Sequence, residues 1–251
     1  MTRLRVAVVA TPRSGNTWVR YVLRDTLDLA DYAVHNYLEL PEELPERAIL
    51  QVHWPREPNF QAFLRKHEFK IVAPRRHPLD ILLSVVHFIA REPQVHRWLE
   101  GNADIPADLT HATATSPEFR RSATSFGAEN LLAVGYQWSF EPSAVPVRYE
   151  DLVARPADVF RGLILQLGGS AARLDEALAE SSFRKFQAMP HRHGWQGKPG
   201  LWKQLIPWPL SQRIAQRHRH VFARLGYNVP FHMLFERQAN LNWARLVADA
   251  P

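Results

Sequence analysis

Residues suited to binding an anion gather in segment 11–17, whose sequence is TPRSGNT. An apolar run precedes the segment and apolar residues at helical spacing follow it, so it is predicted to be a tight turn from a strand into a helix. Such a turn presents backbone N–H groups and the positive end of a helix to an anion, and hydroxyl side chains add donors. The pattern predicts a phosphate site, although it lacks the lysine of nucleoside-triphosphatase loops. An ordinary capped turn with an exposed Arg13 is the alternative.

A second group of residues has the spacing of another anion site. Arg75 and Arg76 end an apolar run, and Ser84 lies eight residues after Arg76, two turns along a helix that Pro78 is expected to start. A guanidinium fork and a serine hydroxyl can bind one phosphate together. The alternative is a solvated arginine pair with a serine that faces the core. Asp80 is interpreted as an acid favoured by the helix dipole rather than as a catalytic group.

The elements that must position these residues alternate along the chain. Short apolar runs predict strands at residues 4–10, 48–53, 70–74 and 146–149, and helices are expected after residue 17, from Pro78 and over 156–167. This alternation predicts an α/β fold with a central parallel sheet flanked by helices and a P-loop-like first turn. We expect one domain over residues 1–251, with residues 92–127 as an insert that covers the substrate.

Composition restricts the class of protein. The 251 residues include no cysteine, which excludes disulfides, thiolate metal sites and a cysteine nucleophile. The hydrophobic share of 46% is that of a globular protein, and the most apolar run, residues 81–90, is too short to span a membrane. We therefore expect a cytoplasmic protein with no signal peptide and no membrane span.

Positive charge is concentrated in residues 181–235, which contain no Asp or Glu. Nine Lys and Arg residues lie there, so the rest of the chain carries a net charge of −3 although the whole chain carries +6. Such a segment attracts anions, whether nucleic acid, sulfated glycan, acidic lipid or a phosphorylated small molecule.

Four motifs in order resemble those of sulfotransferases that use 3'-phosphoadenosine 5'-phosphosulfate (PAPS). TPRSGNTW resembles the family's 5'-phosphosulfate loop, and RHPLDILLSVVHF resembles its 3'-phosphate segment. VRYEDL is similar to a strand-end motif further along the family sequence, and GKPGLWK is similar to the loop that closes over the nucleotide. The resemblance covers about residues 6–203 and implies a PAPS-dependent sulfotransferase whose product is 3',5'-adenosine bisphosphate.

The resemblance also implies roles for individual residues in donor binding. The 5'-phosphate would be held by Arg13, Ser14, Gly15, Asn16 and Thr17. Trp18 would stack on the adenine, while Tyr149 and Phe183 would line its pocket. Arg76 and Ser84 would bind the 3'-phosphate, over which Gly197, Lys198 and the rest of loop 190–205 would close.

His53 takes the place of the family's general base. It would accept the proton of an acceptor hydroxyl or amine, a task that suits a group whose pKa lies near neutrality. Arg13 would stabilise charge on the departing phosphate, and no metal is needed. The acceptor is expected to be a small molecule or a glycan, not nucleic acid, and no motif indicates the oligomeric state. From its pattern alone, His53 also fits a core histidine at a strand end.

Three positions depart from the family pattern. Arg13 replaces a lysine, Gln51 stands where a lysine precedes the histidine, and the pair 195–196 is Trp-Gln instead of Arg-Lys. Charge at the 3'-phosphate would then have to come from other residues, with Arg75, Arg192, His193 and Lys198 as candidates.

Two other functions remain as alternatives. A P-loop-type small-molecule kinase would need Mg²⁺ and a loop lysine, and that lysine is absent. A non-catalytic binder of heparin-like glycan or nucleic acid would use the basic segment but would leave His53 and the first loop unexplained.

Overall fold

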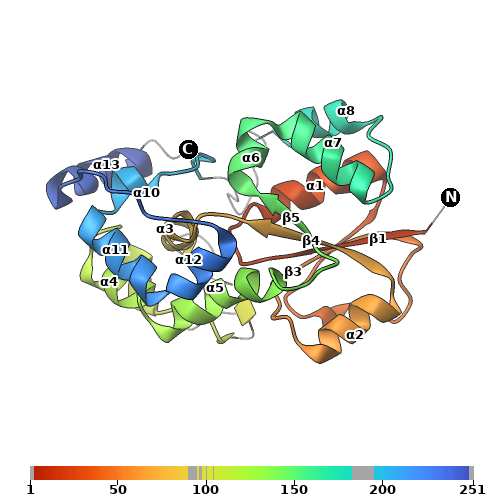
Figure 1. The fold of residues 1–251 in the computed structure, drawn as a ribbon, viewed down its shortest axis with the longest axis horizontal. Helices are drawn as coiled ribbons and strands as arrows, with labels where there is room; N and C mark the ends of the chain where they lie inside the picture. The colour runs from red at the N-terminus through yellow and green to blue at the C-terminus, as the bar shows by residue number, and fades with distance from the viewer. Residues whose placement is uncertain are drawn as a thin grey trace. The chain divides into compact units, whose positions relative to one another are not determined.

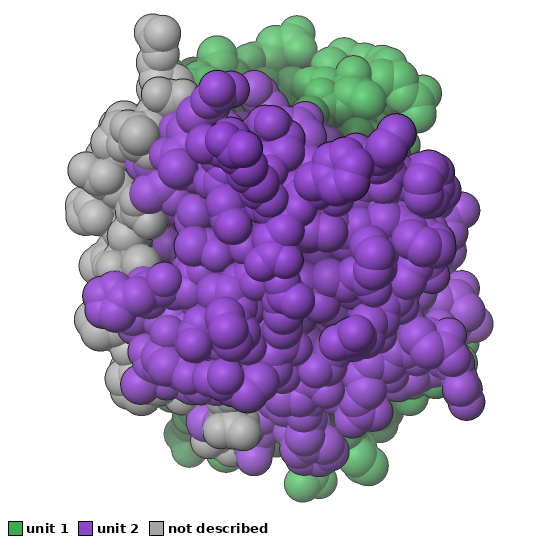
Figure 2. Space-filling model, turned by 90° about the vertical axis from the view of Figure 1, so that its left-hand side faces the viewer, with its two compact units in different colours: residues 1–76, 134–185 green, residues 77–133, 186–251 purple. Residues whose placement is uncertain are grey.

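The chain divides into two compact units, each built from two stretches of sequence. The computed structural model describes residues 3–89, 95, 98–99, 101–103, 105–182 and 195–248. Unit 1 contains residues 1–76 and 134–185, and unit 2 contains residues 77–133 and 186–251, as coloured in Figure 2. The division falls within the region that the sequence predicts to be one domain.

Unit 1 is built on a five-stranded parallel sheet. Its strands are β1 (Leu4–Val9), β2 (Ala30–Ala33), β3 (Arg47–Val52), β4 (Phe69–Arg75) and β5 (Val145–Arg148). The strand order is β2-β3-β1-β4-β5, and each neighbouring pair is parallel. The four predicted strands are confirmed. β2 was missed because this short edge strand is largely exposed and its sequence, ADYA, has no apolar run.

Helices cover both faces of the sheet in unit 1 (Figure 1). The elements are α1 (Asn16–Leu27), η1 (Tyr37–Glu39), α2 (Pro58–Lys66), α6 (Tyr149–Ala154), α7 (Pro156–Gln166) and α8 (Leu174–Glu180). Figure 1 shows α1, α7 and α8 on one face and α2 on the other. Val6, Ile49 and Val72 of the sheet form one core with Leu23 of α1 and Phe160 of α7. The predicted α/β class, with a central parallel sheet flanked by helices, is confirmed.

Unit 2 is helical in its described residues. Its elements are α3 (Pro78–Ile89), η3 (Ala107–His111), α4 (Pro117–Ala123), α10 (Trp202–Leu205), α11 (Trp208–Arg217), α12 (Arg219–Leu225) and α13 (Glu236–Ala248). Helix α5 (Phe126–Trp138) begins in unit 2 and ends in unit 1. All twelve residues of α3 are buried, and the helix starts at Pro78 as predicted. None of the described helices has the length and apolar character needed to cross a membrane.

The described part of insert 92–127 is packed into unit 2. It contributes η3 and α4, and the side chains of Leu109 and Phe119 are buried. Trp98 stacks on Phe88 of α3, with 5.7 Å between the ring centroids. The remaining residues of this insert lie outside the described part, and its covering of a substrate stays a prediction.

Candidate functional site

The predicted phosphate loop and Arg76 meet at the carboxyl ends of β1 and β4. The chain continues from β1 to β2 and β3 on one side of it, whereas β4 lies on the other side. Open parallel sheets bind ligands at such a switch point, in the crevice beyond the strand ends. Arg76 follows β4, and its Nη1 donates a hydrogen bond of 3.0 Å to the carbonyl oxygen of Arg13 in the first loop. The fold thus brings together two of the basic residues singled out in the sequence.

Gly15 gives the first loop its shape. It caps α1 with a φ of 91°, in the left-handed region that favours glycine. A Cβ atom at this position would lie 2.7 Å from Cδ2 of Tyr149, the first residue of α6. The guanidinium of Arg76 lies over the same tyrosine ring, 4.5 Å from its centroid, as a cation–π contact. Tyr149 therefore packs against the first loop and contacts Arg76.

Several polar atoms of this loop, of α1 and of the residue after β4 are buried without a hydrogen-bond partner. Among the described residues, Ser14 Oγ, Asn16 Oδ1, Trp18 Nε1 and Arg76 Nε have no partner. A buried polar group that lacks a partner is costly, so each one needs an explanation, and a ligand that completes its hydrogen bonds is one such explanation. The hydroxyl of Ser14 and the N–H groups of Trp18 and Arg76 are donors, which suits an anionic ligand.

The loop is strongly electropositive. Burial, followed by repulsion from Arg76, lowers the pKa of Arg13 to about 9, while Tyr149 opposes this shift. Arg13 therefore remains charged at neutral pH. No carboxylate in the described part of the chain forms an ion pair with Arg76, which leaves the charge of its guanidinium uncompensated by an acid. Two neighbouring guanidiniums in this setting can bind phosphate or sulfate oxygens through charge-assisted hydrogen bonds.

His53 lies at the end of β3, beside the end of β1. The register pairs Val52 with Val9, and His53 Nδ1 lies 2.9 Å from the carbonyl oxygen of Ala10. Because a carbonyl only accepts, Nδ1 carries the hydrogen and Nε2 is the basic nitrogen. Burial lowers the pKa of His53 to about 4, with smaller contributions in the same direction from His35, Arg13 and Arg20; the Ala10 hydrogen bond opposes the shift. The imidazole is therefore neutral at pH 7.

Two hydrogen bonds from the end of α5 hold the segments that follow β1 and β3, the second of which contains His53. The backbone N–H of Gly135 donates to Thr11 Oγ1 over 3.0 Å, at the start of the first loop, segment 11–17. The indole N–H of Trp138 donates to the carbonyl oxygen of Trp54 over 2.8 Å, directly after His53. These bonds connect the two strand-end segments through one helix, so their relative positions are set by the packing of unit 1.

The structure adds two basic residues that the sequence did not single out. His35 follows β2, and Arg20 is a buried residue of α1 whose Nε lies 3.4 Å from Asp31 Oδ1. Both contribute to the low pKa of His53. His35 was missed because β2 was missed, since residues that follow parallel strands meet at one edge of the sheet.

The other predicted donor residues have the following places. Thr17 and Trp18 are half-buried in α1, and Trp18 packs edge-on against Phe160 with centroids 5.5 Å apart. Gln51, at the place of a family lysine, has a buried Oε1 without a partner among the described residues. Phe183, Arg192 and His193 lie outside the described residues.

Ser84, Gly197 and Lys198 belong to unit 2, whereas Arg76 is the last residue of unit 1's first stretch. Ser84 is buried in α3, Gly197 has a φ of 64° and Lys198 is exposed. The shared 3'-phosphate site of Arg76 and Ser84 stays a prediction.

Asp80 has a role that the sequence did not indicate. Its carboxylate is buried in the first turn of α3 and accepts backbone N–H bonds from Gly200 (2.6 Å) and Trp202 (3.0 Å). These residues belong to the predicted closing loop, 120 or more positions away in sequence. No local pattern relates such distant residues.

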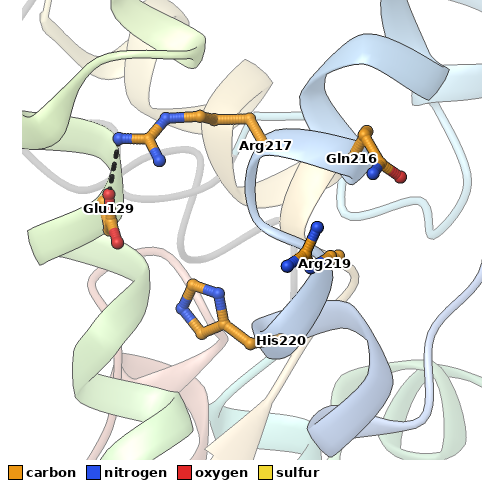
Figure 3. Close-up of a pocket in the computed structure, with 5 residues that line it drawn as sticks. All are labelled: Glu129, Gln216, Arg217, Arg219 and His220. Carbon is orange, nitrogen blue, oxygen red and sulfur yellow. Dashed lines mark hydrogen bonds and ion pairs between the residues drawn. The ribbon is translucent and has the colours of Figure 1, made fainter.

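A separate polar cavity of about 410 Å³ lies in unit 2 (Figure 3). It is lined by Glu129, Gln216, Arg217, Arg219 and His220. Arg217 and Glu129 form an ion pair of 2.7 Å across it. None of the predicted site residues lines this cavity. In the described ranges no group of three or more His, Asp or Glu side chains is arranged to hold a metal ion.

Comparison with known proteins identifies the fold. No protein-family model matches the sequence, and no curated protein matches it. Among solved structures, mouse sulfotransferase SULT7A1 complexed with PAP matches with a TM-score of 0.67 and 14% identity, over 89% of this chain and 86% of that one. Retinol dehydratase in complex with androsterone and the inactive cofactor PAP matches with a TM-score of 0.54 and 12% identity, over 92% and 83%. The chain therefore has the sulfotransferase fold.

Proposed function

We propose that the protein is a sulfotransferase that uses PAPS to sulfate a hydroxyl or amine of a small-molecule or glycan acceptor. The observation that carries this proposal is the pair of buried, unpartnered donors Ser14 Oγ, in the loop after β1, and Arg76 Nε, directly after β4. They lie in a fold that is shared by two solved structures in complex with PAP. An anion with several oxygens would complete the hydrogen bonds of these groups.

Donor binding would divide between two sets of residues. The turn from Arg13 to Thr17 would hold the 5'-phosphosulfate, with the ring of Tyr149 packed against Gly15. Arg76 and Ser84 would hold the 3'-phosphate, together with Gly197 and Lys198. Trp18 and Phe183 would contact the adenine. The donor supplies the sulfuryl group, and the product of its transfer is 3',5'-adenosine bisphosphate.

His53 would take the acceptor's proton at Nε2 while the acceptor oxygen or nitrogen forms its bond to sulfur and the bond from sulfur to the bridging oxygen breaks. The His53 pKa of about 4 is lower than the near-neutral value expected from the sequence, so the imidazole is present in its basic form throughout the neutral range but is a weaker base than an exposed histidine. The Ala10 carbonyl holds Nδ1–H and so stabilises the imidazolium once it forms. Arg13, charged at neutral pH, would stabilise the negative charge that develops on the leaving phosphate.

The first loop does not support the kinase alternative. A kinase loop of this type places a lysine before the hydroxyl residue, whereas this loop has Asn16 before Thr17. Binding of an anionic polymer would use other residues. Arg217 and Arg219 line the polar cavity of Figure 3 and would contact such a polymer. That activity would leave the strand-end donors without a ligand, so we rank it second.

A transfer assay tests the proposal. The protein is incubated with ³⁵S-labelled PAPS and separate pools of phenols, alcohols, amines and desulfated glycans, with a metal chelator present. We expect label to appear in at least one pool, with equal formation of the bisphosphate. Phosphoryl transfer from ATP that requires Mg²⁺, with no sulfuryl transfer to any pool, would contradict the proposal.

A further inference from the structure

Asp80 ties the start of α3 to the segment 195–202. It is the third residue of the helix and is 1% exposed. Each carboxylate oxygen accepts one backbone N–H, Oδ2 from Gly200 and Oδ1 from Trp202. Hydrogen bonds to an ionised acceptor are about twice as strong as neutral ones. His77 adds a second contact, since its ring stacks on Trp202 with centroids 4.7 Å apart.

Three residues on one face of α3 define where segment 195–202 lies along the helix. Asp80, Ser84 and His87 are spaced i, i+4 and i+7, which places them in one stripe along the helix. His87 stacks on Trp195, with centroids 4.5 Å apart and 15° between the rings. The segment is therefore attached to the stripe near its beginning, through Trp195, and near its end, through Gly200 and Trp202. Ser84 lies on the stripe between the two attachments.

Helix α13 holds the segment from another side. Trp243 contacts Trp195 with centroids 5.6 Å apart, and both rings are buried. The side chain of Asn242 donates to the carbonyl oxygen of Gln204 over 2.8 Å. Helix α10, which continues from the segment, lies against both α3 and α13. Trp195 thus has an aromatic contact on each of two helices, at a position where the sulfotransferase pattern has an arginine.

We infer that Asp80 is a positioning residue that fixes segment 195–202, with Gly197 and Lys198, along the Ser84 face of α3 before any donor binds. This part of loop 190–205 would then not have to close over the nucleotide, in contrast to what the resemblance implies. The inference rests on the proposed function for its ligand, the 3'-phosphate, but the attachment itself is a property of unit 2. A segment that is already in place does not lose conformational entropy when the nucleotide arrives, so its contribution to affinity is larger.

The test compares Asp80 with a matched acid. Asp158 is likewise the third residue of a helix that starts with proline, but it is exposed and forms only a 3.8 Å ion pair with Arg161. We would measure the affinity of 3',5'-adenosine bisphosphate and of 5'-AMP for the wild type, Asp80→Ala, Asp80→Asn and Asp158→Ala. We expect Asp80→Ala to weaken the bisphosphate about 10- to 100-fold and 5'-AMP hardly at all.

Asp80→Asn should have a smaller effect, because its amide oxygen still accepts one N–H; this variant also serves if Asp80→Ala folds poorly. Asp158→Ala should bind like the wild type. If both Asp80 variants weaken the two nucleotides equally, or bind both normally, the positioning role is overturned.

Amide hydrogen exchange without ligand separates this inference from the proposed function. The amides of Gly200 and Trp202 should exchange slowly in the wild type and at least 10-fold faster in Asp80→Ala, while those of β1 and β3 stay unchanged. Equal exchange in both proteins would overturn the attachment. A wild type that binds the two nucleotides equally would overturn the proposed function, whatever the exchange shows.

Discussion

The turn between β1 and α1 and the segment 195–202 differ in how their polar groups are satisfied. In the turn, Ser14 Oγ is buried without a partner among the described residues, and so is Nε of Arg76, which follows β4 and donates from Nη1 to the turn. In the segment, Gly200 and Trp202 donate to a buried carboxylate. The turn thus leaves buried polar groups unsatisfied, which we propose a ligand completes, whereas the segment uses its donors to hold its own position. Substitutions that affect one region and not the other test this division of roles.

The largest effect is expected at the strand-end region from His53→Ala. Loss of a positioned proton acceptor should lower turnover by on the order of 10² to 10⁴. The affinity for the bisphosphate should stay within about threefold of wild type, because none of the proposed phosphate contacts uses the imidazole. Turnover is measured with an acceptor found in the transfer assay. His220→Ala, an exposed histidine of the unit 2 cavity, is the control; near-normal turnover in folded His53→Ala would exclude the general-base role.

The next largest effect is expected from Arg76→Ala, which should weaken the binding of a 3'-phosphorylated nucleotide. The loss of its charge-assisted hydrogen bonds should cost about 1.5 to 3 kcal/mol of binding energy for a 3'-phosphorylated nucleotide, with little change for 5'-AMP. Ser84→Ala should also weaken the binding of the 3'-phosphorylated nucleotide relative to that of 5'-AMP, but by a smaller amount. Isothermal titration with both nucleotides measures this. Arg65→Ala, an exposed arginine of α2, is the matched control; equal losses for both nucleotides would show that Arg76 does not contact the 3'-phosphate.

Gly15→Ala should distort the turn itself. A left-handed alanine costs about 1 to 2 kcal/mol, and its Cβ would lie 2.7 Å from the ring of Tyr149. We expect a lower melting temperature together with weaker bisphosphate binding. Gly162→Ala is the matched control in α7, where a Cβ meets nothing within 4 Å and should stabilise the helix by about 0.5 to 1 kcal/mol. A Gly15→Ala protein as stable as wild type would contradict the described loop.

The smallest effect is the pH dependence near neutrality. Only the neutral imidazole of His53 can accept a proton, and its pKa of about 4 keeps it neutral near pH 7. Turnover should therefore be nearly constant from pH 8 to 6. Below pH 4 it should fall about tenfold per pH unit. Because this pKa lies below the unfolded value near 6.5, the contribution of His53 to stability is complete above pH 6.5 and is lost as the pH falls to 4. A turnover profile with a midpoint at 6.5 would contradict the buried environment.

The sequence predicted those parts of the molecule that depend on local patterns. Apolar runs indicated β1, β3 and β4, and proline indicated the start of α3. The sequence predicts the first loop and Arg76 as parts of two separate anion sites, and only the structure shows the hydrogen bond between them, at the edge where parallel strands end.

Contacts between distant residues could not be predicted. Arg56 and Glu141 form an ion pair of 2.9 Å across 85 positions, and Asp80 binds Gly200 across 120. Trp195 stands where the family pattern has an arginine. Its contacts with His87 of α3 and Trp243 of α13 explain the aromatic residue, but these contacts are known only from the positions of the two helices. The low pKa of His53 likewise depends on the burial of its side chain, which cannot be predicted from the position of a histidine after a strand.

Calorimetric titration of the wild-type protein tests the central claim most directly. The protein is titrated with 3',5'-adenosine bisphosphate in the presence of a metal chelator, and separately with ATP and Mg²⁺ and with a heparin fragment. We predict saturable binding of the bisphosphate at one site per chain, weakened by Arg76→Ala. Binding of ATP only with Mg²⁺, or of heparin alone, with no heat from the bisphosphate, would contradict the claim that the strand-end donors form a site for the sulfuryl donor.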